Sequence, residues 1–175
     1  MFPLISVNLP NVVVNANEIN LNFLRRKRGD DQGPFLIIAR ACGYALDVGF
    51  SAVAGTIPHV WPPHGEIQQL WNLRPSGKAG EVVLASVASG LVLGALQTRK
   101  SHDDWPVLEE AETGSKWQRW HLEPSADNAG YLLRLSGSAL CLTMNADAEP
   151  EWRPWLAPRD PQRSQQWMIV QPYGR

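Results

Sequence analysis

Long apolar runs are absent from this sequence. No stretch approaches the ~18 to 20 apolar residues that a membrane-spanning helix requires. Cysteine is scarce: Cys42 and Cys141 are too few for a disulfide scaffold, and their presence does not imply a bridge. The net charge of -1 provides no overall field that would draw the chain to nucleic acid or to an anionic membrane. These absences argue against a helical membrane protein, a disulfide-stapled miniature and a strongly basic nucleic-acid binder.

Motifs of several enzyme classes are missing as well. The sequence contains no HExxH, no GxSxG and no glycine-rich phosphate loop after a strand. The two cysteines lack the CxxC spacing of metal or redox sites. Asp103-Asp104 and Glu109-Glu110 are paired carboxylates, but adjacent strand residues point to opposite faces, and we expect a long loop over residues 96–110. We therefore expect no enzymatic activity, no metal and no cofactor.

The N-terminus lacks the features of a secretory signal. MFPLISVNLPNVVV has no basic residues ahead of its apolar ones, and Pro3, Asn8 and Pro10 interrupt the run. We expect a cytoplasmic protein, or one released without a signal peptide.

A small motif of Gln, any residue and Trp occurs three times at even spacing. Trp71 and Trp120 are 49 residues apart, and Trp120 and Trp167 are 47 apart. The motifs are Gln69-Leu70-Trp71, Gln118-Arg119-Trp120 and Gln165-Gln166-Trp167. Evenly spaced self-similarity of this kind indicates a fold built from internal repeats.

Each motif is preceded by a leucine at a matched distance. Leu46, Leu93 and Leu142 lie 25, 27 and 25 residues before their tryptophans. The runs between these landmarks are short, rich in β-branched residues and separated by Gly, Pro, Asp, Asn and Ser, which is typical of strands. We predict an all-β fold of about twelve short strands with pseudo-threefold symmetry, in repeats of about 35–78, 79–126 and 127–172.

The Gln and Trp of each motif share one strand face, because residues two apart on a strand point the same way. We predict Trp71, Trp120 and Trp167 as structural core. A buried glutamine amide needs hydrogen-bond partners, and we expect backbone groups of turns to supply them.

On these residues the chain resembles the ricin B-chain type of β-trefoil lectin domain over roughly residues 35 to 171. The resemblance implies a β-trefoil that binds galactose or N-acetylgalactosamine type glycans, with one possible pocket per repeat. It implies an Asp after the upstream Leu, an aromatic ring about ten residues before the Trp, and an amide just before the motif. The motif's Gln is expected to support the Asp. A carboxylate can accept hydrogen bonds from two vicinal hydroxyls of a sugar, and a flat ring can pack against its C–H face. An amide can then fix the orientation of the sugar.

Only the first repeat matches this set. We predict sugar contacts from Asp47, Trp61 and Gln68, with Gln69 behind Asp47 and a further polar contact from His59. The alternatives are that Asp47 merely caps its own turn, that Trp61 is a core residue and that His59 is an exposed strand-end histidine. We assign no role to His64, His102 or His121.

The corresponding positions of the other two repeats have changed. They hold Gly94, Glu110 and Trp117 in the second repeat, and Thr143, Ala157 and Ser164 in the third. A single shallow site predicts weak binding, so useful avidity would require oligomerisation. A strictly monomeric protein in light scattering would contradict that expectation.

A different class of function is a protein-binding trefoil, such as a protease inhibitor acting through its loops, or a targeting module without a sugar site. The changed second and third repeats, with loops around 101–104 and 146–154, favour this reading. An Asp47→Ala variant separates the two, because it removes sugar binding and leaves loop-mediated binding intact.

Residues 1–34 precede the repeats as an arm. Ile19 to Phe23 alternates apolar residues with Asn, so we expect a β-hairpin over about 12–24 and a homodimer formed through it. The basic run Arg25-Arg26-Lys27-Arg28 has the composition of a nuclear import or phosphate-binding patch. Asp30 and Asp31 follow closely, and we interpret the run as a solvated loop.

Overall fold

The computed structural model describes residues 31–96 and 105–172, and these contain twelve strands and three short 3-10 turns. The strands are β1 (Gln32–Ala39), β2 (Ala45–Asp47), β3 (His59–Trp61), β4 (Leu70–Pro75), β5 (Glu81–Ser86), β6 (Val92–Ala95), β7 (Pro106–Glu109), β8 (Trp120–Pro124), β9 (Tyr131–Leu135), β10 (Leu140–Thr143), β11 (Trp155–Pro158) and β12 (Gln166–Val170). In the described part of the chain, no helix is long or apolar enough to cross a membrane.

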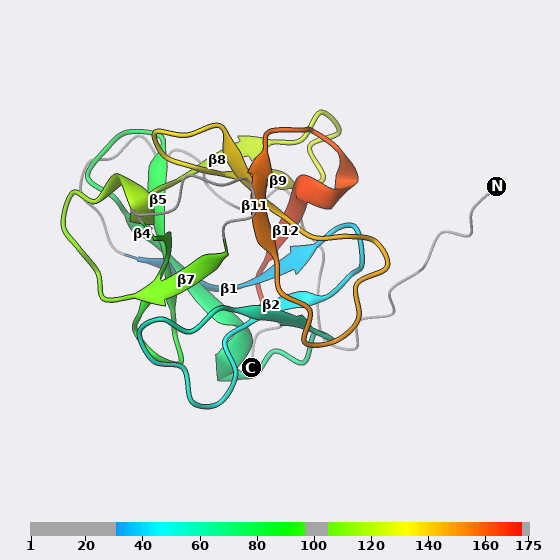
Figure 1. The fold of residues 1–175 in the computed structure, drawn as a ribbon, viewed down its shortest axis with the longest axis horizontal. Coiled ribbons are helices and arrows are strands. Elements are labelled where there is room, and N and C mark those ends of the chain that lie inside the picture. Colours follow the sequence, from blue (N-terminus) through cyan, green and yellow to red (C-terminus); the bar gives the residue numbers. More distant parts are fainter. Residues whose placement is uncertain (1–30, 97–104, 173–175) are drawn as a thin grey trace.

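Six of the strands close into a barrel. β1 pairs with β4 and β12, β4 with β5, β5 with β8, β8 with β9, and β9 with β12, all antiparallel. The other six form the hairpins β2–β3, β6–β7 and β10–β11, one for each group of four consecutive strands. Figure 1 shows these hairpins arranged around the barrel strands. This is a β-trefoil, and the predicted fold class is confirmed.

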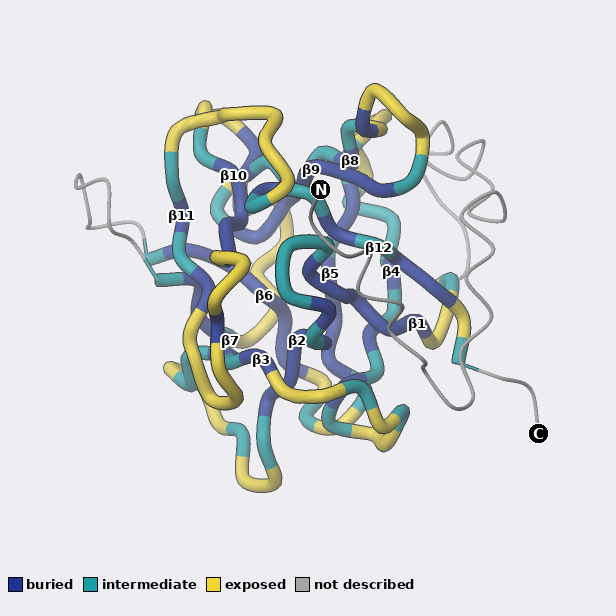
Figure 2. The backbone as a smooth tube through the Cα atoms, turned by 90° about the vertical axis from the view of Figure 1, so that its right-hand side faces the viewer, coloured by how far each residue is buried: buried dark blue, intermediate teal, exposed yellow. Residues whose placement is uncertain are grey.

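The three tryptophans occupy equivalent places in the centre of the core. Trp71, Trp120 and Trp167 have no exposed surface. Figure 2 shows that the buried stretches of backbone lie mainly in the strands. The indole Nε1 of each donates a hydrogen bond to the carbonyl of the upstream leucine of its own repeat, at 3.1 Å to Leu46, 2.9 Å to Leu93 and 2.9 Å to Leu142. The spacing found in the sequence therefore records a physical contact, because each Trp must reach one particular carbonyl.

The three motif glutamines are also buried, and each sits at the end of a 3-10 turn. These turns are η2 (Ile67–Gln69), η3 (Lys116–Gln118) and η4 (Arg163–Gln165). The amide of Gln118 accepts from the N–H of Glu112 at 2.7 Å and donates to the carbonyl of Glu110 at 2.8 Å. Gln69 and Gln165 hold the same part of their own repeats in the same way. The expected satisfaction by turn backbone is confirmed.

Two expectations are changed by the observed strands. Residues 106–109, expected within a long loop, form strand β7, because Val107 and Leu108 bury their side chains opposite Leu93 and Gly94 of β6. β1 begins at Gln32, inside the segment expected to precede the repeats. The predicted hairpin over residues 12–24, the dimer expected through it and the basic run of residues 25–28 lie outside the described residues.

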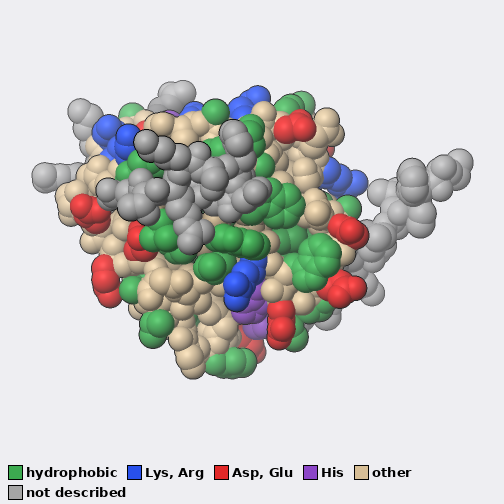
Figure 3. All heavy atoms as spheres, viewed as in Figure 1, with side chains coloured by type: hydrophobic (Ala, Val, Ile, Leu, Met, Phe, Trp, Pro, Cys, Tyr) green, Lys and Arg blue, Asp and Glu red, His purple; other side chains and the backbone are tan. Residues whose placement is uncertain are grey.

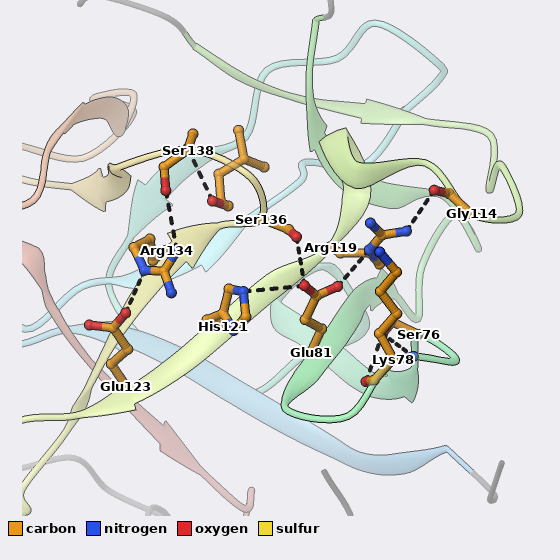
Figure 4. Close-up of polar contacts among 11 residues, drawn as sticks. Ser76, Lys78, Glu81, Gly114, Arg119, His121, Glu123, Arg134, Ser136 and Ser138 are labelled. Carbon is orange, nitrogen blue, oxygen red and sulfur yellow. Dashed lines mark hydrogen bonds and ion pairs between the residues drawn. The ribbon is translucent and has the colours of Figure 1, made fainter. Parts of the chain in front are cut away.

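A polar cluster joins β5 to β8 and to the end of β9 (Figure 4). The Glu81 carboxylate lies 2.6 Å from Nε of Arg119 and 3.2 Å from Nε2 of His121, and it accepts a hydrogen bond from the Ser136 hydroxyl at 2.7 Å. Burial of Glu81 by itself raises its pKa, but the Ser136 hydrogen bond and the charges of Arg119 and His121 together lower that pKa below its usual value. The cluster therefore holds a buried carboxylate in its charged form.

Candidate sugar-binding site

The predicted residues of the first repeat come together around one pocket of about 650 Å³. In the β2–β3 hairpin Asp47 pairs with His59, and Ala45 pairs with Trp61. The pocket is lined by Asp47, Gly49, Phe50, His59, Trp61, His64, Glu66, Gln68 and Glu151. Four of the five predicted residues line it, and Gln69 lies behind the loop that forms one wall.

Asp47 is the buried carboxylate at the base of the pocket, with only 4% of its surface exposed. Its Oδ1 accepts a hydrogen bond from the N–H of Gly49 at 2.7 Å. Gly49 has a positive φ of 72°, a backbone conformation that is unfavourable for residues with a side chain. Nε2 of His59 lies 3.7 Å from Oδ1, and Nε2 of His64 lies 3.3 Å from Oδ2. Asp47 therefore does cap its own turn, but only through Oδ1; its Oδ2 faces His64.

His64 is a member of the site that the sequence reading did not assign. Its Nδ1 accepts a hydrogen bond from the N–H of Glu66 at 3.1 Å, so Nδ1 carries no proton in this arrangement. The hydrogen of the neutral ring is then on Nε2, which faces Oδ2 of Asp47. The imidazole thus lies beside the carboxylate oxygen of Asp47 that does not accept from Gly49.

Gln69 acts on the wall of the pocket and not on Asp47. Its Oε1 accepts from the N–H of His64 at 2.8 Å and of Gly65 at 3.3 Å, and its Nε2 donates to the carbonyl of Pro62 at 3.1 Å. Gln69 is wholly buried, so it cannot touch a ligand. The expectation that it supports Asp47 directly is wrong here: all of its described hydrogen bonds go to the loop of residues 62–65, which places His64.

The rings of Trp61 and His59, both on β3, pack edge to face. Their ring centroids are 6.4 Å apart with perpendicular planes, and 36% of Trp61 is exposed. Trp61 is thus not a core residue, in keeping with the Pro62-Pro63 pair that follows it. Gln68 lines the pocket, and its side-chain oxygen is buried without a hydrogen-bond partner among the described residues, so this amide must turn to reach a ligand.

Glu151 reaches the pocket from the third repeat. Its N–H donates to the carbonyl of Val60 at 2.8 Å, and the N–H of Val60 donates to the carbonyl of Trp152 at 2.8 Å. These two bonds attach the 149–152 turn to the free edge of β3. Glu151 has a positive φ of 71°, a conformation that costs free energy for a residue with a side chain and that persists when its surroundings hold it.

The second repeat has no room for an equivalent carboxylate. A Cβ added to Gly94 would lie 2.9 Å from the Trp117 carbonyl oxygen and 3.1 Å from a carboxylate oxygen of Glu109. The strand register places Glu109 opposite Val92, as Trp61 lies opposite Ala45. The counterpart of Trp61 is therefore Glu109 and not the predicted Glu110, because the following loop is one residue longer than in the first repeat.

The third repeat has kept the scaffold and lost the acid. Oγ1 of Thr143, at the position of Asp47, accepts from the Gln165 amide at 3.1 Å and donates to the Cys141 carbonyl at 2.9 Å. Trp155 lies opposite Thr143, as His59 lies opposite Asp47. Here the motif glutamine does support the residue at the acid position, as the resemblance implied.

Residues 31–96 and 105–172 contain no group of three or more His, Cys, Asp or Glu side chains arranged to hold a metal ion. The first-repeat pocket instead combines a carboxylate, two imidazoles, an amide and an exposed indole, which are groups that hydrogen-bond hydroxyls and pack on C–H surfaces.

Comparison with known families gives one match. A family model described as a ricin-type beta-trefoil lectin domain-like family matches residues 67–155. No curated protein sequence gives a significant match.

Solved structures share the fold over most of both chains. The designed threefold-symmetric protein ThreeFoil is 25% identical with a TM-score of 0.73, covering 79% of this chain and 99% of its own. A ricin B-like lectin of Macrolepiota procera, solved in complex with lactose, is 19% identical with a TM-score of 0.66, covering 83% of this chain and 99% of its own. The Rhizoctonia solani agglutinin is 18% identical with a TM-score of 0.69, covering 82% and 98%.

Proposed function

Since the chain belongs to the ricin-type β-trefoil lectin domain-like family, we propose that it is a lectin that binds galactose or N-acetylgalactosamine type glycans, mainly through the first-repeat pocket. The proposed role is recognition without catalysis. The observation that carries it is the meeting of Asp47, His59, Trp61 and Gln68 around one pocket, while the second and third repeats lack the acid.

In this proposal the sugar lies with one face against Trp61 and its hydroxyls directed at the base of the pocket. Oδ2 of Asp47 accepts from a hydroxyl in the position that Nε2 of His64 now approaches at 3.3 Å. Charge-assisted hydrogen bonds to a carboxylate are stronger than neutral ones, so Asp47 supplies most of the polar binding energy. The Gln68 side chain turns so that its amide oxygen, buried in this structure, accepts from a second hydroxyl and fixes the orientation of the ring.

Affinity in such a site is expected to be low. A millimolar dissociation constant corresponds to about -4 kcal/mol, which one carboxylate, one ring and one amide can provide. Two or more copies acting together would raise the avidity. The homodimer proposed for this purpose uses the arm of residues 1–34, most of which lies outside the described residues.

The test is a glycan array on the tagged full chain, with Asp47→Ala beside it. The wild type is expected to bind terminal galactose or N-acetylgalactosamine, and Asp47→Ala is expected to lower that signal at least tenfold, since a charged hydrogen bond is worth about 1.5–3 kcal/mol. Thr143→Ala is the matched control, because Thr143 occupies the same position in the third repeat.

The outcomes separate the two classes of function. Loss of binding in Asp47→Ala with retention in Thr143→Ala supports a lectin with one working pocket. If the wild type binds no glycan while its tryptophan fluorescence shows a folded core, the proposal fails and the trefoil is a scaffold for protein binding.

A further inference from the structure

The first-repeat pocket is larger and less uniform than one sugar ring needs. Its volume of about 650 Å³ lies in the middle of the roughly 300–1,000 Å³ range of pockets that take drug-sized ligands. The groups assigned above to the first sugar, Asp47, Trp61 and Gln68, account for one part of the lining. Phe50 and Glu151 line the pocket as well, and neither has a role in the binding of that ring.

Phe50 is the most exposed large apolar side chain of the described residues, at 94%. It follows the Asp47–Gly49 turn by one residue, so the hydrogen bond from Gly49 to Asp47 fixes the backbone beside it. An aromatic ring that faces water and lines a pocket contributes to folding very little, because it buries almost nothing. Its apolar surface becomes useful when a ligand covers it.

Apolar exposure is concentrated around this pocket. Among the described residues, the large apolar side chains with substantial exposure are Phe50, Val53, Trp61, Ile67 and Trp152. Phe50 and Trp61 line the pocket, and Trp152 follows Glu151, which also lines it. Figure 3 shows a histidine surface bordered by apolar, acidic and basic side chains on the face seen in Figure 1.

The charge of the lining limits what can occupy the space beyond the first sugar. Asp47, Glu66 and Glu151 are acidic, and no lysine or arginine lines the pocket. Two backbone hydrogen bonds join Val60 to Glu151 and Trp152, so the backbone of Glu151 is fixed beside the pocket. Carboxylates accept hydrogen bonds from hydroxyls and repel anionic groups.

We propose that Phe50 and Glu151 form a second subsite that takes the next ring of an uncharged oligosaccharide, with Phe50 against its C–H face and Glu151 accepting from a hydroxyl. The inference rests on the proposed function, since the first ring must be held at Asp47. It adds that the protein distinguishes a disaccharide from a monosaccharide, and a neutral glycan from an acidic one. It also gives the third repeat a part in binding, through Glu151.

The test is isothermal titration calorimetry of the full chain with galactose and with lactose, which presents the same terminal galactose on a second ring. Wild type is expected to bind lactose about three- to tenfold more tightly than galactose, the range for one aromatic contact. Phe50→Ala is expected to abolish that difference and leave galactose affinity unchanged. Val53→Ala is the matched control, because Val53 is an exposed apolar residue of the same loop, at 65%, that does not line the pocket.

Glu151→Gln tests the charge of the second subsite. Lactobionate carries terminal galactose on an open-chain carboxylate, and it is expected to bind wild type no more tightly than galactose does. Glu151→Gln is expected to raise the affinity for lactobionate and to leave galactose unchanged. An unchanged lactobionate affinity in this variant would place Glu151 outside the subsite and overturn its role.

The results for the proposed function and for the second subsite are distinguishable. If galactose binds but lactose binds equally well, or if Phe50→Ala weakens both sugars by the same factor, the second subsite is wrong and the first-repeat lectin site stands. If neither sugar nor any other neutral glycan binds the wild type, the proposed function fails and the second subsite fails with it.

Discussion

At the scale of single residues, the carboxylate of Asp47 already has three polar neighbours. It accepts from Gly49, and the imidazoles of His59 and His64 lie within 3.7 Å and 3.3 Å of it. A carboxylate offers about four lone-pair sites, so these neighbours leave little capacity for a sugar diol. His64 is the more exposed of the two histidines, and Gln69 holds the backbone of its loop.

His64 therefore competes with the ligand for Oδ2 of Asp47. We expect His64→Ala to bind galactose about two- to tenfold more tightly, because the net value of one hydrogen bond is about 0.5–1.5 kcal/mol. Titration calorimetry of the variant beside wild type measures this. Weaker binding in the variant would show that His64 contacts the sugar itself and does not compete with it.

The residues of the site differ in how far the sequence alone predicts them. Asp47, Trp61 and Gln68 are predicted from their spacing to the repeated motif, and His59 from its place two residues before Trp61. His64 does not, because its approach to Asp47 depends on how Gln69 folds the loop of residues 62–65. The sequence holds one signal for the position of this loop: the buried amide of Gln69 needs backbone partners, and the loop supplies them.

At the scale of strands and turns, the charged cluster of Glu81 connects elements of two different repeats. Arg119 and His121 belong to the β8 region of the second repeat, and Ser136 follows β9 of the third. The lowered pKa of Glu81 means that folding favours its charged form. That contribution to stability is complete above the ordinary pKa of 4.5 and is lost as the pH falls through the lower pKa of the folded state.

We expect Glu81→Gln to lower the free energy of unfolding at pH 7 by about 3 kcal/mol, because it leaves the buried Arg119 without its counter-charge. The difference from wild type should shrink as the pH falls from about 4.5 through the lower pKa of the folded state, where the wild-type carboxyl becomes neutral too. Urea unfolding at a series of pH values measures it. Glu112→Gln, a change at an exposed acid with no ion pair among the described residues, should show no such pH dependence. A deficit in Glu81→Gln that stays constant down to pH 3 would contradict the ionic explanation.

Loops were harder to predict than strands for a related physical reason. The alternation of residues 106–109 is short and follows a stretch without clear periodicity, so pairing with β6 decides that β7 is a strand. Likewise, Glu151 enters the pocket because the 149–152 turn bonds to Val60 of another repeat. The spacing of residues within one repeat does not predict which residues of another repeat will contact it.

At the scale of the whole molecule, the fold holds itself together without covalent links. Cys42 and Cys141 are both free thiols, which answers a question that their number alone leaves open. Burial raises the pKa of the Cys141 thiol to about 11, with the Glu123 carboxylate adding to the effect, and burial also raises the pKa of Cys42. Neither thiol is strongly nucleophilic at neutral pH, because thiolates are the reactive form.

A reducing agent is therefore expected to leave the thermal unfolding midpoint of the protein unchanged. Thiol titration should find two reactive groups in denaturant, and in the native protein both should react slowly, with Cys141 the slower. Differential scanning calorimetry with and without dithiothreitol provides the check. A midpoint that falls by several degrees on reduction would mean that the two thiols are bonded.

The pairing of β1 with β12 links the two ends of the described chain, with Leu36 opposite Val170. During synthesis from the N-terminus, β1 is made early and its partner is made almost last. At about 5–20 residues per second, roughly 7 to 27 seconds separate these two residues on the ribosome. Through that interval β1 carries an unpaired edge that invites association with neighbouring nascent chains. In the finished protein the closed barrel shields every one of its strands. The protein therefore needs a chaperone most during synthesis, before β12 has been made.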